Sequence, residues 1–173
     1  MISSTTELRT LKSVCPRVEV RILDLQTWLT SQKIWYRFIE KPETIHTADA
    51  SAVTGVDLTR LTKNLVSKTS TGEYILIIVS GTAKVDLKKV AKVLGVSNIS
   101  LASFAEAESV SGYPPGATPS VFHKSKLRVI MDNSLIANDT LFCGGGARNR
   151  ILELKVEDVV GLNDALVSDI QKK

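Results

Sequence analysis

One lysine stands in a half-apolar stretch, where it shares a face with two leucines. Lys63 lies between Leu61 and Leu65 in a run that alternates as a β-strand does, and the alternation places all three side chains on one face. A lysine on such a face either extends to solvent along a strand edge or has its ammonium group held in a pocket. The pattern leaves both interpretations open, and the second makes Lys63 a candidate site residue.

A second feature is the loop Gly112–His123. It opens with Gly-Tyr-Pro-Pro-Gly-Ala-Thr-Pro, which is too rich in glycine and proline for a helix or a strand. Gly112 and Gly116 can adopt positive φ and expose backbone N–H groups, while the prolines stiffen the loop. Fixed, exposed N–H groups suit the binding of an anion or of an oxyanion. A rigid turn without a binding role is the alternative.

The third feature is the glycine run Gly144–Gly146, which is followed by Arg148 and Arg150. Residues without side chains allow the backbone or a phosphate of a ligand to approach closely. A bulged strand end explains the glycines equally well, so the run by itself does not decide between the two.

Many common enzyme signatures are missing. GxxxxGK[ST], GxGxxG, HExxH and GxSxG do not occur, which excludes the usual nucleotide-binding, zinc-protease and serine-hydrolase motifs. His46 and His123 are the only histidines, too few for a His-rich metal site, and His46 fits a loop or the start of a helix. Cys15 and Cys143 lack CxxC spacing and fit buried thiols in a reduced, cytoplasmic setting. We therefore expect no metal and no cofactor.

Positive charge gathers in one segment. Residues 60–92 hold seven basic and two acidic side chains, a net charge of +5, whereas the whole chain carries +4. The densest part consists of Lys84, Lys88, Lys89 and Lys92. A localised basic face indicates a polyanionic partner such as nucleic acid, and a solvated helix face explains the charge alone equally well.

Periodicity and turn residues predict the elements that position these features. The predicted strands are 34–39, 61–68, 74–79, 127–131, 141–143 and 152–156. The predicted helices are 47–53, capped by Thr47, then 86–94, 103–112 and a terminal segment beginning at Asp158 or Asn163. Gly55, Gly95 and Gly112 are the expected helix ends. Ser103 and Glu106 have the spacing of a capping box.

These elements predict one α+β domain. A chain of 173 residues with 43% hydrophobic and 23% charged residues favours a single folded domain that needs no disulfide. Hairpin-length gaps between several strands argue against a regular βαβ winding. We interpret residues 1–20 as an N-terminal extension and residues 21–173 as the domain. Spacing from Pro16 to Leu29 fits a helix, although Val18–Ile22 alternates like a strand.

No segment suggests a membrane or secretory destination. The longest apolar run, Tyr74–Val79, is far shorter than the roughly 20 residues of a membrane helix. Residues 1–11 lack the apolar core of a secretory signal. We therefore expect a cytoplasmic protein.

In this order and spacing, the features resemble the YbaK/ProX family of aminoacyl-tRNA deacylases, which is related to the editing domain of bacterial prolyl-tRNA synthetases. The similarity runs from about Ile34 to the C-terminus. It is carried by Lys63-x-Leu65-Val66, Lys84–Lys89, Ala105-Glu106, Gly112–Gly116, the strand ending at Asp132 and the glycines near Gly145. The loop departs from the family pattern, because Pro119 comes one place early.

The resemblance implies a fold and an activity. The fold would be a mixed, barrel-like β-sheet flanked by helices. The activity would be hydrolysis of the ester that joins a wrong amino acid, such as cysteine or alanine, to tRNA for proline, performed in trans and without a cofactor. The pocket would lie between the strand of Lys63, the loop Gly112–Ser120 and the region of Asp132.

The resemblance also implies roles for individual residues. Lys63 would position the substrate, and the backbone of Gly116, Ala117 and Thr118 would stabilise the oxyanion. The substrate-binding residues would be Gly112, Pro119, Ser120, Asp132, Gly145 and Gly146. The residues that bind tRNA phosphates would be Lys84, Lys88, Lys89 and Lys92.

Two other functions stay open at this point. The altered loop around Pro119 is compatible with a non-catalytic module that binds an aminoacyl or nucleotide end, docked on a synthetase. The basic segment alone is compatible with a nucleic-acid-binding protein that has no small-molecule pocket. Catalytic turnover and the effect of Lys63→Ala distinguish the three.

Overall fold

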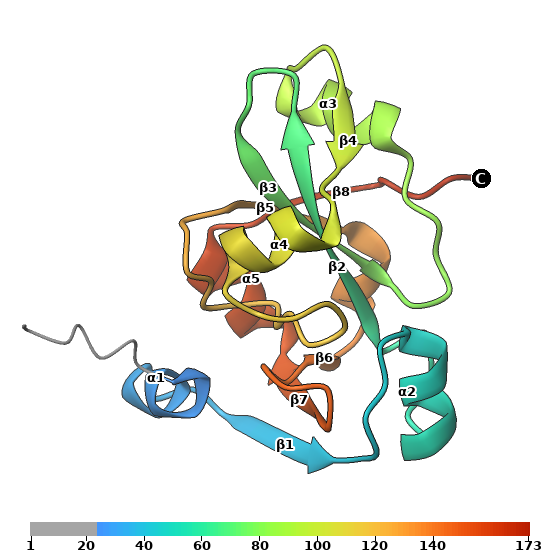
Figure 1. The fold of residues 1–173 in the computed structure, drawn as a ribbon. Coiled ribbons are helices and arrows are strands. Elements are labelled where there is room, and N and C mark those ends of the chain that lie inside the picture. The colour runs from blue at the N-terminus through green and yellow to red at the C-terminus, as the bar shows by residue number, and fades with distance from the viewer. Residues whose placement is uncertain (1–23) are drawn as a thin grey trace, which may run out of the picture.

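The structure, a computed structural model, describes residues 24–173 (Figure 1). The helices are α1 (Leu25–Ser31), α2 (Thr47–Thr54), α3 (Leu87–Leu94), α4 (Phe104–Ser111) and α5 (Val156–Asn163), with a 3-10 helix at Asn133–Ala137. The strands are β1 (Tyr36–Glu40), β2 (Thr62–Thr69), β3 (Tyr74–Ser80), β4 (Ile99–Leu101), β5 (Arg128–Asp132), β6 (Thr140–Gly144), β7 (Arg150–Lys155) and β8 (Leu166–Ser168). The predicted extension 1–20, Cys15 and the possible strand at Val18–Ile22 lie outside the described residues.

The strands form two open sheets. One has the order β1-β7-β6 and is antiparallel, and the other has the order β4-β2-β3-β5-β8. In the larger sheet β5 runs parallel to both β3 and β8, while the other neighbours are antiparallel. A bridge between Leu61 and Phe142 links the start of β2 to β6. The α+β prediction is confirmed, although the sheets do not close into a barrel.

Strand β3 lies in the middle of the larger sheet and is buried on both faces. Ile75 and Ile77 belong to a core that includes residues of α3, whereas Leu76 and Ile78 belong to a larger core that includes residues of α1, β7 and α5. Burial on both faces explains why this strand is a continuous apolar run rather than an alternating one. Its neighbour β2 is therefore held firmly, and β2 carries Lys63.

Helix α3 agrees with its prediction. Asp86 caps its first turn by accepting hydrogen bonds from the backbone N–H groups of Lys88 and Lys89, and Gly95 ends it in the left-handed region at φ 70°. Val90 and Leu94 are buried against the larger sheet. The lysines consequently lie on the outer side of the helix.

Helix α4 delivers the chain into the glycine- and proline-rich loop. Ser103 and Glu106 form the predicted capping box, with both reciprocal hydrogen bonds present. Gly112 ends the helix at φ 83°. The loop that follows is neither helix nor strand, as its composition predicted.

A few local predictions were wrong. Helix α5 begins at Val156, and Asn163 is its last residue rather than its first. Val156 continues the alternation of Leu152 and Leu154, and this pattern hides the point where strand becomes helix. Thr47 is the first residue of α2 rather than its cap, a position that His46 takes without a side-chain hydrogen bond. Strands β4 and β8 span three residues each and were not predicted.

Candidate functional site

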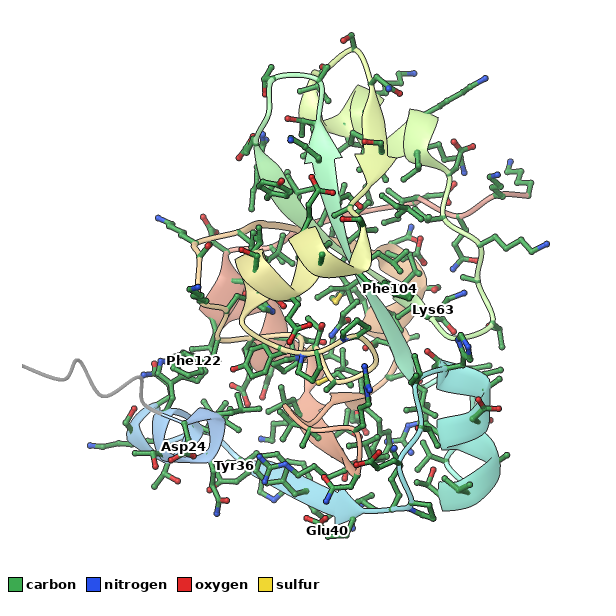
Figure 2. All side chains as sticks on the ribbon, in the orientation of Figure 1. Asp24, Tyr36, Glu40, Lys63, Phe104 and Phe122 are labelled. Atoms are coloured by element: carbon green, nitrogen blue, oxygen red, sulfur yellow. The ribbon has the colours of Figure 1, made fainter. Side chains whose placement is uncertain are left out.

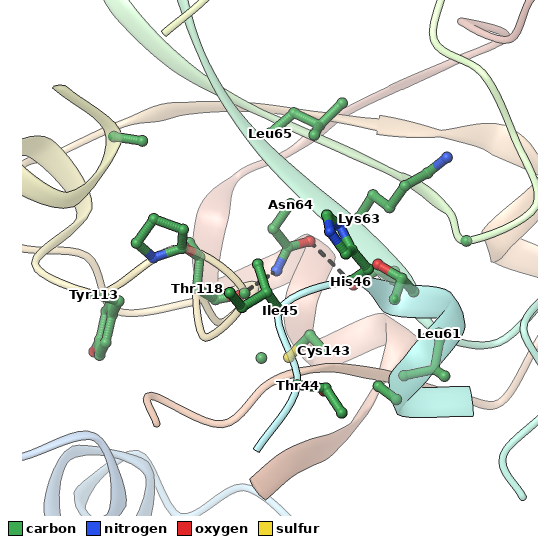
Figure 3. A pocket seen from close by; sticks show the side chains of 18 of the residues that line it. Thr44, Ile45, His46, Leu61, Lys63, Asn64, Leu65, Tyr113, Thr118 and Cys143 are labelled. Carbon is green, nitrogen blue, oxygen red and sulfur yellow. Dashed lines mark hydrogen bonds between the residues drawn. The ribbon is translucent and has the colours of Figure 1, made fainter. Parts of the chain in front are cut away.

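A cavity of about 430 Å³ lies where β2 passes the end of the smaller sheet (Figure 3). Its walls come from β2, from residues 44–50, which include the first turn of α2, from the end of β4 and the start of α4, and from the loop after α4. Cys143 and Gly144 of β6 close it on a further side. The cavity thus collects segments that are widely separated in the sequence.

Asn64 holds the loop Gly112–Ser120 against β2. Its side-chain amide donates a hydrogen bond of 2.9 Å to the carbonyl oxygen of Thr118 and one of 3.0 Å to the hydroxyl of Ser120. The amide oxygen accepts a hydrogen bond of 3.0 Å from the Thr62 hydroxyl. Figure 3 shows Asn64 pointing toward Thr118, so this side chain fixes the position of the loop backbone.

Two glycines allow the loop to pack closely on its neighbours. Gly116 has φ +84°, and a Cβ there would lie 2.7 Å from the Cα of Ile45. A Cβ on Gly144 would lie 2.4 Å from the carbonyl carbon of Ala117 and 2.5 Å from the carbonyl oxygen of Thr118. Because the obstructing atoms are backbone, neither contact can be relieved by a side-chain rotation.

The backbone N–H groups of the loop differ in whether the protein itself uses them. The N–H of Ala117 donates to the carbonyl of Pro114 at 3.0 Å, and the N–H of Ser120 donates to the Sγ of Cys143 at 3.4 Å. Within residues 24–173 no hydrogen bond uses the N–H of Gly116 or of Thr118, and both residues line the cavity. These two groups are therefore the donors that a bound oxygen atom can use.

Lys63 lines the cavity from the other face of β2. Its ammonium group donates a hydrogen bond to the carbonyl of Ala83, and its side chain extends away from Thr118 (Figure 3). Burial lowers the pKa of Lys63, and the positive charge of Lys84 lowers it further. Of the two possibilities that the sequence left open, a lysine at a solvent-exposed edge or a lysine in a pocket, the lining position agrees with the pocket. The ammonium group itself is bonded to Ala83 rather than to the loop.

Lys41 and Arg148 brace the rim of the cavity. The Lys41 ammonium group donates to the Thr44 hydroxyl at 2.6 Å and to the carbonyl of Arg148. The Nε of Arg148 donates to the carbonyl of Pro115 at 2.9 Å. Burial lowers the pKa of Lys41, and the nearby Glu43 opposes this effect. The loop after α4 is thus tied to the segment before α2 through two basic side chains.

Cys143 is a buried acceptor rather than a nucleophile. Burial raises the pKa of its thiol to about 11, so the group is protonated at neutral pH. Its sulfur receives the Ser120 N–H. This agrees with the interpretation of Cys143 as a buried thiol.

The structure brings together only some of the predicted site residues. Lys63, Gly116 and Thr118 line the cavity. Ala117, Pro119 and Ser120 are buried behind that surface, and Gly112 ends α4 at the beginning of the loop. The other predicted substrate-binding residues, Asp132, Gly145 and Gly146, do not line the cavity.

Asp132 is fully buried and occupied by contacts within the protein. Its carboxylate accepts hydrogen bonds from the N–H of Ser134 at 2.9 Å, the N–H of Ile170 at 3.0 Å and the Nε2 of Gln171 at 2.7 Å. Burial raises the pKa of this carboxyl, but these hydrogen bonds outweigh it and hold the pKa below its ordinary value. Asp132 thereby anchors the C-terminal segment to the end of β5.

Gly145 and Gly146 support the loop from behind. The N–H of Gly146 donates to the carbonyl of Ala117 at 2.9 Å, and the carbonyl of Gly145 accepts from the Nε of Arg150 at 2.7 Å. Gly144, the first residue of the glycine run, is the one that reaches the cavity.

The predicted tRNA-binding lysines lie on and before α3, outside the cavity lining. Lys84, Lys88 and Lys92 are exposed. Lys89 is instead engaged, because its ammonium group pairs with Asp169 at 2.7 Å and donates to the carbonyl of Gln171 at 2.8 Å. Three of the four lysines are thus available to a partner.

Sequence reasoning missed Asn64, Lys41 and Thr44, and it gave His46 no role although His46 lines the cavity. A signal existed only for Asn64, which is a polar side chain next to Lys63 in the predicted strand 61–68. The partners of Lys41 lie 3 and 107 residues away, and the second distance has no sequence signature.

Residues 24–173 contain no group of three or more His, Cys, Asp or Glu side chains placed to hold a metal ion. None of the helices formed by these residues has the length and apolar character needed to cross a membrane.

Comparison with known proteins places this site in a family. Residues 41–162 match the family described as the aminoacyl-tRNA editing domain. A proline–tRNA ligase from Thiobacillus denitrificans is 28% identical over 109 residues, which cover 62% of this chain and 19% of the ligase. A protein from Enterococcus faecalis that bears the name of a Cys-tRNA(Pro)/Cys-tRNA(Cys) deacylase, EbsC, is 20% identical over 138 residues, covering 80% of this chain and 84% of that protein. The chain therefore spans about a fifth of the length of the ligase and most of the length of the second relative.

Solved structures share the fold. A crystal structure described as a trans-editing enzyme for prolyl tRNA synthetase matches with a TM-score of 0.72 and 24% identity, covering 80% of this chain and 87% of that one. The crystal structure of a hypothetical protein matches with a TM-score of 0.79 and 23% identity, covering 85% and 98%. Since the family match spans most of the chain, the protein belongs to the aminoacyl-tRNA editing domain family, as its sequence resemblance predicted.

Proposed function

We propose that this protein hydrolyses the ester bond between a wrong amino acid and the 3′-terminal adenosine of tRNA. The observation that carries the proposal is the cavity that Lys63, Gly116 and Thr118 line together, where the backbone N–H groups of Gly116 and Thr118 make no hydrogen bond within residues 24–173. Membership of the aminoacyl-tRNA editing family supports this substrate class. The names of the deacylase and trans-editing relatives support the reaction.

The loop donors would stabilise the charge that develops during hydrolysis. Water attacks the ester carbonyl carbon, and the carbonyl oxygen becomes negatively charged in the tetrahedral intermediate. The N–H groups of Gly116 and Thr118 would donate hydrogen bonds to this oxygen. One such donor contributes about 3–4 kcal/mol in enzymes where it has been removed. The bond between the carbonyl carbon and the ribose oxygen then breaks, and the ribose oxygen takes a proton.

Lys63 would position the substrate rather than transfer protons. Its ammonium group is bonded to the Ala83 carbonyl in this structure, so the side chain would have to turn from Ala83 toward the cavity to contact an oxygen of the bound ester. A cation in that position would orient the ester relative to the loop donors. Cys143 would not compete with water as the nucleophile, because burial raises the pKa of its thiol to about 11.

The proton transfers would be assisted by the substrate. An aminoacyl ester is already labile, and the ribose hydroxyl next to it can pass a proton between the attacking water and the leaving oxygen. Correct placement of reacting groups can lower a barrier by about 7–11 kcal/mol. Replacing that hydroxyl with hydrogen should abolish most of the enzymatic rate, and an unchanged rate would contradict this part of the mechanism.

The amino acid would be small. The cavity of about 430 Å³ has to hold the ester, the ribose and the side chain, and Leu61, Leu65 and Ile151 supply apolar wall. We propose cysteine or alanine carried by tRNA for proline as the substrate, acted on in trans and, as translation requires, in the cytoplasm. The similarity to proline–tRNA ligases supports tRNA for proline as the carrier of the amino acid, and it supports a synthetase as a partner.

The exposed lysines Lys84, Lys88 and Lys92 would bind tRNA phosphates. Their charges are not consumed by ion pairs within residues 24–173. Phosphate contacts release counterions, so binding would weaken as the salt concentration rises.

The test is deacylation of tRNA for proline charged with alanine, cysteine, serine or proline. We expect turnover of one mischarged species and its loss in Lys63→Ala. Lys68→Ala is the matched control, because Lys68 lies on the same strand but outside the cavity lining, where it contacts Glu106 and the ring of Tyr74. Absence of turnover on every species, with tight binding of tRNA, would overturn the proposal in favour of a binding module.

A further inference from the structure

An apolar rim borders the mouth of the cavity. Phe104, the first residue of α4, is 69% exposed, and Leu101, the last residue of β4, is 54% exposed. Both line the cavity, as does Ile45 from the opposite chain segment. Phe104 is the most exposed large hydrophobic side chain within residues 24–173. Packing inside the protein therefore does not explain why an aromatic ring stands at this place.

The backbone beneath Phe104 is fixed. The N–H of Ala102 donates to the carbonyl of Val66 at 3.0 Å, which ties the segment to β2. The capping box of Ser103 and Glu106 orders the first turn of α4, and the Tyr74 hydroxyl donates to Glu106 at 3.1 Å. The point from which the ring extends is therefore fixed, and only the two side-chain torsions of Phe104 have to be ordered when a ligand stacks on it. Figure 2 shows where Phe104 and Lys63 lie on the molecule.

We propose that Phe104, with Leu101 beside it, is the stacking platform for the base of the 3′-terminal adenosine. This rests on the proposed function: with the ester held in the cavity beside Gly116 and Thr118, the base would lie one ribose away, toward the exposed edge that Phe104 and Leu101 form. A purine has a flat face that stacks on an aromatic ring, and the aliphatic Leu101 extends the apolar surface beneath it.

Stacking of this kind acts on binding and not on the chemical step. The base keeps the same contact in the ground state and in the transition state, so the platform contributes uniform binding. We expect Phe104→Ala to raise KM for the aminoacyl-tRNA about tenfold with kcat nearly unchanged. Phe104→Tyr should restore the wild-type KM, because it keeps the ring. Phe104→Leu should not, because it keeps apolar area without a flat aromatic face.

A binding experiment tests the platform without any turnover. The first probe is alanine joined through an amide to 3′-amino-3′-deoxyadenosine, which cannot be hydrolysed as an ester. The second probe is the same amide on a ribose without a base. We expect the wild type to bind the first probe about tenfold more tightly than the second, measured by NMR titration. In Phe104→Ala the two affinities should become equal.

The control variant is Trp35→Ala, which removes an aromatic side chain that is 46% exposed but does not line the cavity. It should preserve the difference between the probes. If Phe104→Ala also preserves the difference, the proposal is overturned. If the difference depends on Phe104 but the protein hydrolyses no aminoacyl-tRNA, the proposed function fails while the base platform stands.

Discussion

The side-chain amide of Asn64 donates a 2.9 Å hydrogen bond to the carbonyl oxygen of Thr118, across 54 residues of sequence. Strand β2 thereby holds the loop that contributes Gly116 and Thr118 to the cavity lining. The contact couples the sheet to the candidate oxyanion site, and it can be broken without changing any group that would touch the ester oxygen.

We expect Asn64→Ala to lower kcat/KM about 10- to 100-fold. The loop would lose the two hydrogen bonds that the Asn64 amide donates to Thr118 and Ser120, and its N–H groups would shift relative to the ester oxygen. The free energy of unfolding should fall by about 1–3 kcal/mol, since the Thr118 carbonyl loses a partner. Deacylation kinetics and urea unfolding measure the two effects. Asn98→Ala, at an exposed residue on the connection to β4, is the control and should change neither. Full activity of Asn64→Ala would show that the loop needs no support from β2.

Gly144→Ala should be among the most damaging single substitutions. The added Cβ would lie 2.4 Å from the Ala117 carbonyl carbon, so the loop backbone has to shift. A displacement of about 1 Å at a reacting centre can cost about 100-fold in rate, and we expect a loss of that size. Gly161→Ala is the matched control, because a Cβ there meets nothing within 4 Å and its helical position favours alanine. Equal activities in the two variants would contradict the close packing of the loop on β6.

The pH dependence of kcat should report on Lys63. Burial and the charge of Lys84 lower the pKa of Lys63 below its ordinary value of 10.5, so the ammonium group is lost at a lower pH than for an exposed lysine. Activity should therefore fall on the alkaline side as pH rises through this lowered pKa. Lys84→Ala removes a neighbouring positive charge, which raises the pKa of Lys63 and moves the fall to higher pH. The rate is measured from about pH 7 to pH 10 after subtracting uncatalysed hydrolysis.

Lys88→Ala serves as the control for that profile. Lys88 is an exposed residue on α3 and does not contribute to the pKa shift of Lys63. Its alkaline fall should coincide with that of the wild type. If Lys84→Ala leaves the profile in place as well, the charge of Lys63 is not what limits the rate.

The salt dependence of tRNA binding should show whether the exposed lysines of α3 contact phosphates. Each lost phosphate contact should reduce the slope of log affinity against log salt by about 0.7–0.9. We expect such a reduction in Lys88→Ala and in Lys92→Ala, measured by fluorescence anisotropy of labelled tRNA. Lys155→Ala, exposed at the end of β7, is the control and should leave the slope unchanged. A slope that none of these substitutions alters would place the tRNA on another surface.

Asp132→Asn should affect stability rather than substrate binding. The amide would turn a donor toward the N–H groups that now bind the carboxylate, at a cost of about 1–3 kcal/mol in unfolding free energy. Because the folded-state pKa of Asp132 lies below its ordinary value of 3.8, its stabilising contribution is complete above that value and is lost as the pH falls through the lowered pKa. The difference from the wild type should therefore shrink in acid.

Urea unfolding at neutral and acidic pH measures the difference in unfolding free energy between Asp132→Asn and the wild type. The KM for aminoacyl-tRNA shows whether substrate binding is unchanged, as we expect. Asp139→Asn, at an exposed aspartate, should be neutral in both. A raised KM in Asp132→Asn with unchanged stability would return Asp132 to the substrate-binding set that the family resemblance implied.

Much of the fold could be predicted because its signals are local. Helix α3 begins after the cap Asp86 and ends at Gly95. Helix α4 begins with the capping box of Ser103 and Glu106 and ends at Gly112. The hydrogen bonds at these helix ends each span only a few residues. Such contacts depend on nearby sequence and hardly on the rest of the protein. The start of α5 was predicted wrongly because the local signal misleads there. The alternation of apolar residues continues through Val156, although the helix begins at that residue.

The sequence by itself determined the α+β class, the order of most elements, the family, and the presence of a lysine and a glycine-rich loop. Only the tertiary structure decided which of these meet. It placed Gly116 and Thr118 beside the cavity and Asp132 away from it, because their positions depend on partners such as Asn64 and Gln171, which lie 54 and 39 residues away. Contacts over such distances arise when the sheets assemble, and no spacing along the chain encodes them.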